Sequence, residues 1–149
     1  MDGYSNMAGM WLVGEDMPQE TNRVTLSSVK DQYGLPVADV HFDDHANDIA
    51  MRDHAYKQGA ALYDAVGATR SFPTPPYPST HNLGTNRMSA NARDGVVNKW
   101  GQTHDIKNLF VSDGSQFTSG GAENPTLTIV SLAIRQAEYI ADQMKTKTI

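Results

Sequence analysis

The sequence predicts an α+β fold: a mixed, largely antiparallel sheet with helices on one face. Three observations predict it. Two segments of β-prone residues flank a polar turn in the first third of the chain, a long stretch of helical period follows them, and a second such stretch closes the chain. Alternating apolar and polar residues are typical of half-buried strands, whereas apolar residues three or four positions apart form one face of a helix. With 149 residues, the chain is long enough for one domain with a moderate core.

The sheet is expected to begin as a hairpin. Its first strand covers residues 23–27, where Val24 and Leu26 share a face. The polar segment that follows ends at Pro36, which disfavours helix in the residue before it and is typical of a turn. Apolar and polar residues alternate again over 37–42. Two strands joined by a polar turn predict an antiparallel pair with one half-buried face.

The first helix is expected from Asn47 to about Val66, where Gly67 provides a natural stop. Asn47 or Asp44 is the expected N-cap, because short polar side chains accept hydrogen bonds from the first free amides of a helix. Its apolar face recurs mainly every seven residues. That face consists of Ile49, Tyr56, Ala60 and Tyr63.

A proline-rich segment follows this helix. Residues 72–78 contain four prolines in seven positions. Each proline ring fixes φ and removes an amide donor, so the segment must be extended. We expect a stiff strap that delivers the segment beginning at His81 to a fixed place.

The last third is expected to contain short buried strands at 95–98 and 109–112, and then a turn that includes Asp113 and Gly114. The final helix is predicted to begin at Asn124 and Pro125. Asn is a favoured N-cap, and proline is favoured at the first helical position.

Composition excludes several classes of function. The chain carries 12 Lys and Arg residues, scattered singly, against 17 Asp and Glu residues, and its net charge is −5. Nucleic-acid binding is not expected, because phosphate recognition needs clustered basic residues. With no cysteine there is no disulfide, thiolate nucleophile or Cys-ligated metal. No apolar stretch approaches the roughly 20 residues of a membrane helix, so we expect no membrane insertion. We expect a soluble chain; if it is part of a longer protein, a missing N-terminus would decide between cytoplasm and periplasm.

Three histidines lie near acidic residues at the start of the first helix: His41, His45 and His54. A metal-dependent hydrolase using His41 and His45 is one alternative. Their spacing matches no zinc pattern, however, and a solvated helix start explains them more simply. The chain also lacks the Gly-x-Ser-x-Gly of acyl-transfer enzymes and the Gly-x-Gly-x-x-Gly of dinucleotide-binding folds.

Four blocks carry the strongest signal: HNLGTNRMS (81–89), DGVVN (94–98), NLFVSDGSQF (108–117) and SGGAENPTLTIVSLAIRQAEYIAD (119–142). Together they resemble the C-terminal signature of the glucose–methanol–choline (GMC) family of FAD-dependent oxidoreductases. They follow the family's order, and Asn124 lies 43 positions after His81. The segments GEDMPQETNRVTL and DDHANDIAMRDHAY are similar to the flavoprotein subunits of bacterial sugar and polyol dehydrogenases, of the choline dehydrogenase-like type.

The resemblance implies a domain organisation. Residues 1–93 would be a portion of the substrate domain, and residues 94–149 would return to the FAD domain, to which the final helix belongs. The Gly-rich nucleotide-binding domain of the family has no counterpart in this sequence. The expected partners are therefore that N-terminal FAD domain and a small alcohol or sugar. Exposed apolar residues on the final helix also predict a possible homodimer.

The resemblance also implies a chemistry, the oxidation of a CH–OH group to a carbonyl with hydride transfer to flavin N5. His81 would accept the hydroxyl proton and Asn124 would orient the substrate oxygen. Taken alone, a loop histidine is more often an ordinary surface residue, and an asparagine before proline is more often only a cap. The residues expected to lie along the cofactor are Asp113, Gly114, Pro125, Thr126 and Leu127. A helix N-terminus suits the negative charge that a reduced flavin gains.

Two further expectations complete the prediction. The chain by itself should retain no FAD and should be inactive. The alternative to an enzyme is a non-catalytic binding or assembly module with the same fold.

Overall fold

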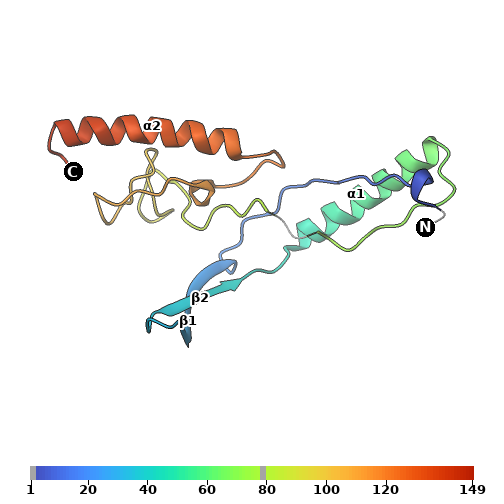
Figure 1. Ribbon diagram of the computed structural model, residues 1–149, viewed down its shortest axis with the longest axis horizontal. Helices are drawn as coiled ribbons and strands as arrows, with labels where there is room; N and C mark the ends of the chain where they lie inside the picture. Colours follow the sequence, from blue (N-terminus) through green and yellow to red (C-terminus); the bar gives the residue numbers. More distant parts are fainter. Residues whose placement is uncertain (1–2, 78–79) are drawn as a thin grey trace.

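The structure is a computed structural model that describes residues 3–77 and 80–149. Its elements in chain order are η1 (Tyr4–Asn6), β1 (Arg23–Lys30), β2 (Pro36–His41), α1 (Ala46–Ala65), η2 (Gly114–Gln116) and α2 (Thr126–Lys145). The α+β class is therefore confirmed. Figure 1 shows an elongated molecule in which α1 and α2 lie towards opposite ends.

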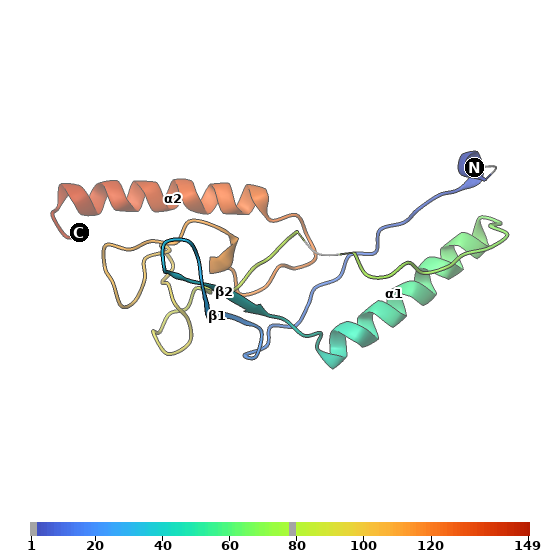
Figure 2. The same ribbon diagram turned by 60° about the horizontal axis from the view of Figure 1, so that its bottom comes forward.

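The two strands pair antiparallel, as expected. Val24 lies opposite Val40 and Leu26 opposite Ala38, so the apolar side chains of both strands share one face. The register shifts between Leu26 and Lys30, as at a β-bulge. That face is not covered within the described residues, since Leu26 is 78% exposed and Val40 is 70% exposed. In Figures 1 and 2, α1 lies beyond the end of β2 and not across the face of the hairpin.

The sheet is smaller than predicted. Residues 95–98 and 109–112 were expected to form strands, but in the described part of the chain they form only isolated bridges. Val97 pairs with Met88 and with Thr103, and Gln102 pairs with Phe110. A left-handed glycine between the two segments turns the chain back before a longer ladder can form. These bridges hold loops together and do not extend the hairpin.

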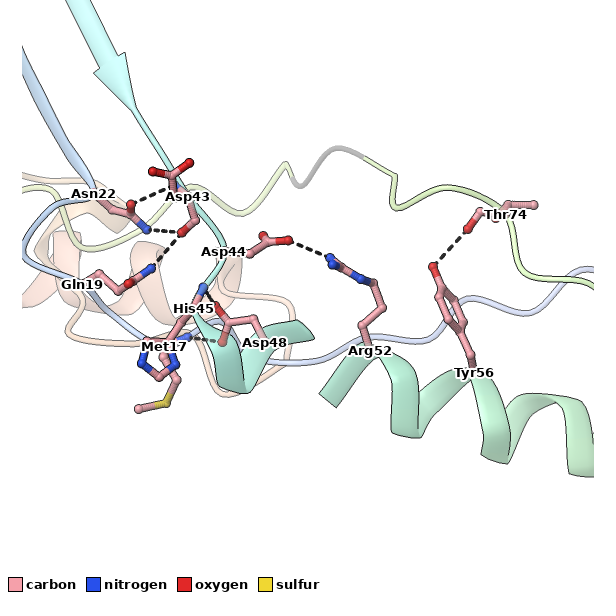
Figure 3. Close-up of polar contacts among 10 residues, drawn as sticks. All are labelled: Met17, Gln19, Asn22, Asp43, Asp44, His45, Asp48, Arg52, Tyr56 and Thr74. Atoms are coloured by element: carbon pink, nitrogen blue, oxygen red, sulfur yellow. Dashed lines mark hydrogen bonds and ion pairs between the residues drawn. The ribbon is translucent and has the colours of Figure 1, made fainter. Parts of the chain in front are cut away.

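The N-terminus of α1 is capped by His45, so the prediction of Asn47 or Asp44 is wrong. The His45 Nδ1 atom accepts a hydrogen bond from the backbone N–H of Asn47 at 3.1 Å. Asp48 completes a capping box by accepting from the His45 N–H at 2.9 Å (Figure 3). Asp44 is unavailable as a cap because its carboxylate pairs with Arg52 at 2.9 Å.

Two extended segments run along α1, and Figures 1 and 2 show both. The Tyr63 hydroxyl donates to the carbonyl of Ala8 at 3.1 Å, which fixes the N-terminal segment. On the strap, the carbonyl of Thr74 accepts from the Tyr56 hydroxyl at 3.0 Å (Figure 3). The two tyrosines of the predicted apolar face therefore donate hydrogen bonds to the backbone of the two segments beside α1. Pro78, the last residue of the expected strap, lies outside the described residues.

The other half of the molecule packs its loops beneath α2. Val97 is the one fully buried apolar side chain among the described residues. The Gln136 side chain, on α2, donates to the carbonyls of Trp100 at 3.0 Å and Val111 at 2.8 Å. The Trp100 ring stacks on Tyr139, with centroids 4.8 Å apart. Polar and aromatic contacts thus join α2 to the loops. Neither of the two described helices is long and apolar enough to cross a bilayer.

Candidate active site

His81 opens the segment that follows the strap, and its side chain is exposed. Two residues later, Leu83 turns inward and meets three other parts of the chain. A Cβ added at Gly114 would lie 2.6 Å from Leu83 Cδ2 and 3.3 Å from Ile129 Cδ1. One added at Gly120 would lie 3.0 Å from Leu83 Cδ1. Leu83 therefore packs where η2, the loop before α2 and the first turn of α2 converge.

Hydrogen bonds also join the segment that follows His81 to η2. The backbone N–H of Asn86 donates to the carbonyl of Ser115 at 2.9 Å, and its side chain donates to the Ser115 hydroxyl at 3.1 Å. The N–H of Met88 donates to the carbonyl of Gln116 at 2.8 Å. Asp113 forms the expected turn, because its carboxylate accepts from the Ser115 N–H at 2.8 Å. The segment beginning at His81 is thus fixed to the turn.

The start of α2 differs from the prediction by one residue. Pro125 occupies the N-cap position, and the helix itself begins at Thr126. The Ile129 N–H closes the first turn on the Pro125 carbonyl at 2.9 Å. Asn124 therefore lies outside the cap, and no side chain caps this end. Because its amide group is not used in capping, the exposed Asn124 side chain is available to bind something else.

The free amides at this end also include those of Thr126 and Leu127, both of which are exposed. A helix N-terminus combines such unpaired donors with partial positive charge. The arrangement suits an anion or a group that becomes negative during a reaction.

Glu15 enters this region from the N-terminal segment and was not among the predicted site residues. Its Oε1 atom accepts a hydrogen bond from the Gly121 N–H at 2.9 Å. That bond lowers the pKa of Glu15, and the Ser119 hydroxyl lowers it further. Glu15 and Gly121 are 106 positions apart, so no spacing rule connects them. The only signal was that Glu15 belongs to the GED segment of the family resemblance.

His104 lies beside a serine hydroxyl, a pair of groups that can form a nucleophile in other enzymes. The Nε2 atom of His104 lies 3.2 Å from the Ser89 hydroxyl oxygen, but this hydroxyl donates to the carbonyl of Asn91 at 2.6 Å. Because the hydroxyl proton points to Asn91, His104 does not activate Ser89 as a nucleophile. Two of the three histidines near the start of α1 have structural contacts: His45 caps α1, and His41 pairs with Asp43 at 3.1 Å.

Comparison with known proteins identifies the family of the chain. Residues 18–133 match the model of a family described as GMC oxidoreductase. The chain belongs to this family, and the match is to the C-terminal part of it. The resemblance stated from the four sequence blocks is confirmed.

Several characterised relatives are enzymes. The chain is 45% identical over 142 residues to a 2-methyl-1,2-propanediol dehydrogenase of Mycolicibacterium austroafricanum, covering 93% of this chain and 26% of that protein. It is 33% identical over 135 residues to the fructose dehydrogenase large subunit of Gluconobacter japonicus, with coverages of 88% and 24%. A C-glycoside 3-oxidase of Arthrobacter globiformis is 32% identical over 134 residues, with coverages of 87% and 26%. The chain thus spans about a quarter of the length of these relatives.

Proposed function

We propose that this chain carries the proton-transfer part of the active site of an FAD-dependent oxidoreductase that acts on CH–OH groups. One observation supports the proposal above the others: Leu83, from the His81 segment, and Ile129, in the first turn of α2, both lie against Gly114. In such a reaction a base accepts the hydroxyl proton, and a helix N-terminus suits the negative charge that the reduced flavin gains. The family to which the chain belongs is generally FAD-dependent.

His81 is the proposed base. Oxidation of an alcohol removes the hydroxyl proton together with a hydride from the same carbon. Imidazole suits the first step, because it can accept and release a proton near neutral pH. The exposed position of His81, on a segment anchored by Leu83, gives a substrate access to it.

Asn124 is the proposed orienting residue. Its neutral amide can donate a hydrogen bond to the substrate oxygen without competing for the proton. It also adds no positive charge that would disfavour the protonated form of His81. The absence of a side-chain cap on α2 supports this role, because the amide group has no structural use at the helix end.

The residues present fit a flavin at the start of α2. Bound FAD would supply the hydride acceptor. Thr126 and Leu127 would present backbone N–H groups to the edge of the ring that becomes negative. Pro125, lacking an N–H, would set the direction of the helix start. Asp113 is exposed and Gly114 is buried under Leu83, so of the two Asp113 is better placed to lie along the cofactor.

The substrate is proposed to be a polyol or a sugar. The relatives are named for a diol, for fructose and for a C-glycoside, and all of these carry several hydroxyl groups. A dehydrogenase is favoured over an oxidase by the most similar of these three relatives. By itself the purified chain is expected to show no flavin absorbance, because it offers the flavin only a turn and one helix end.

Replacing His81 tests the proposal. In the FAD-loaded enzyme that carries this sequence, His81→Ala should lower turnover by about 10²–10⁴-fold, the usual contribution of a general base. His54→Ala is the matched control, because His54 is an exposed histidine on α1 far from this junction. It should leave turnover unchanged. Near-normal turnover of His81→Ala with full FAD content would exclude His81 as the base.

A further inference from the structure

The loop that leads to Asn124 has an unfavourable backbone. Gly121 has φ +66° and Ala122 has φ +61°. Glycine adopts this left-handed region readily, whereas a residue with a Cβ does so at a cost. Ala122 therefore keeps this conformation only where the surroundings hold it. Asn124 follows two positions later, so its direction depends on what holds this loop.

The Glu15 carboxylate is the group that holds it. It accepts from the Gly121 N–H at 2.9 Å, and both the Ser119 hydroxyl and the Gly120 N–H also stabilise its charge. Consecutive backbone N–H groups that converge on one carboxylate form a small anion-binding concavity. Here the anion comes from the chain itself.

Glu15 is itself held from the other side. The preceding residue, Gly14, packs against the Met51 side chain on α1. Two residues after Glu15, the N–H of Met17 donates to the buried carboxylate of Asp48 at 3.0 Å (Figure 3). The N-terminal segment is therefore fixed to α1 on both sides of Glu15. Through Glu15, this segment connects the α1 half of the molecule with the start of α2.

We propose that Glu15 is a positioning residue for Asn124: by accepting hydrogen bonds from the loop 119–121, it fixes the direction in which Asn124 meets the substrate. This inference rests on the proposed function. Glu15 touches neither substrate nor cofactor in it and acts only through the loop. Removing its carboxylate should leave the fold and the FAD content intact but allow Asn124 to move.

Hydrogen exchange tests the contact independently of activity. In the 149-residue chain, Glu15→Ala should speed exchange of the Gly121 amide by at least about threefold, because its acceptor is lost. Glu20→Ala is the matched control, since Glu20 is an exposed glutamate on the same segment. It should leave this amide unchanged. An unchanged Gly121 exchange rate in Glu15→Ala would overturn the proposal, whatever the fate of the proposed function.

A double-mutant cycle tests the link to Asn124. In the FAD-loaded enzyme, Glu15→Ala should lower kcat/KM by about tenfold, the order of effect expected from a small misplacement of an orienting group. In an Asn124→Ala background the same change should have almost no effect, because the group it positions is gone. Equal effects in the two backgrounds would reduce Glu15 to a structural contact and overturn the proposal. The His81→Ala result reports separately on the proposed function.

Discussion

At the scale of single residues, Gly101 shows how one position joins the loops to α2. Its φ of +69° lies in the left-handed region. A Cβ there would also overlap the side-chain nitrogen of Gln136 and lie 2.6 Å from the carbonyl oxygen of Val111. Those two atoms are donor and acceptor of the same hydrogen bond. An added methyl group at Gly101 would therefore separate α2 from the loop beneath it.

Gly101→Ala is accordingly expected to destabilise the chain strongly. We expect a loss of about 2–4 kcal/mol, from left-handed strain together with displacement of the buried Gln136 side chain. Gly34→Ala is the matched control: Gly34 has φ +80° but nothing lies within 4 Å of an added Cβ, so only the strain of about 1–2 kcal/mol applies. Urea midpoints measured at one protein concentration compare the two. Equal losses would show that the contact with Gln136 contributes nothing.

At the scale of elements, α1 depends on a buried carboxylate at its start. Asp48 is only 3% exposed and accepts from the backbone N–H groups of His45 and Met17. The first bond caps the helix, and the second attaches the N-terminal segment. One side chain thus determines both where α1 begins and what runs beside it.

Asp48→Ala should therefore weaken the helix and release the segment together. We expect a loss of about 1–3 kcal/mol, because a cap is removed and two backbone N–H groups lose their acceptor. Proteolysis should also cleave more rapidly around Met17. Asp53→Ala, on an exposed turn of the same helix, is the control and should change neither measurement appreciably. Helix content by circular dichroism and rate of cleavage are the two readouts. If only one of them changed, the two roles of Asp48 would be separable.

Elements with local signals could be predicted, and those with distant partners could not. The hairpin and both helices follow from periodicity and turn residues within a few positions. His81 and Asn124 were found because they belong to recognisable blocks. By contrast, Glu15 has its partner 106 positions away. The cap at His45 was missed because histidine is an uncommon N-cap, and the strand around Val97 was overestimated because an apolar run does not reveal whether a neighbour will pair with it.

At the scale of the whole molecule, the chain exposes far more surface than its mass requires. Its accessible surface is 11,822 Å², whereas a compact monomer of 16.3 kDa exposes about 7,500 Å². Part of this excess is apolar and lies on α2, where Leu127 is 83% exposed and Ile134 is 59% exposed. Such a face is favourable to bury against another surface.

The proposed division of the chain into two domain portions after residue 93 stays a prediction.

The isolated chain is therefore expected to associate with itself through α2. In sedimentation velocity, the average mass should rise with concentration, because only pairing covers the apolar face. The double change Val130→Glu and Ile134→Glu should weaken association by about tenfold or more, since each glutamate would place a charge in the interface. Leu35→Glu is the control, because Leu35 is equally apolar and exposed but lies in the hairpin turn. If Leu35→Glu weakened association as much as the α2 changes, the hairpin and not α2 would be the contact. A chain that stays monomeric at every concentration would show that neither face is sufficient for pairing.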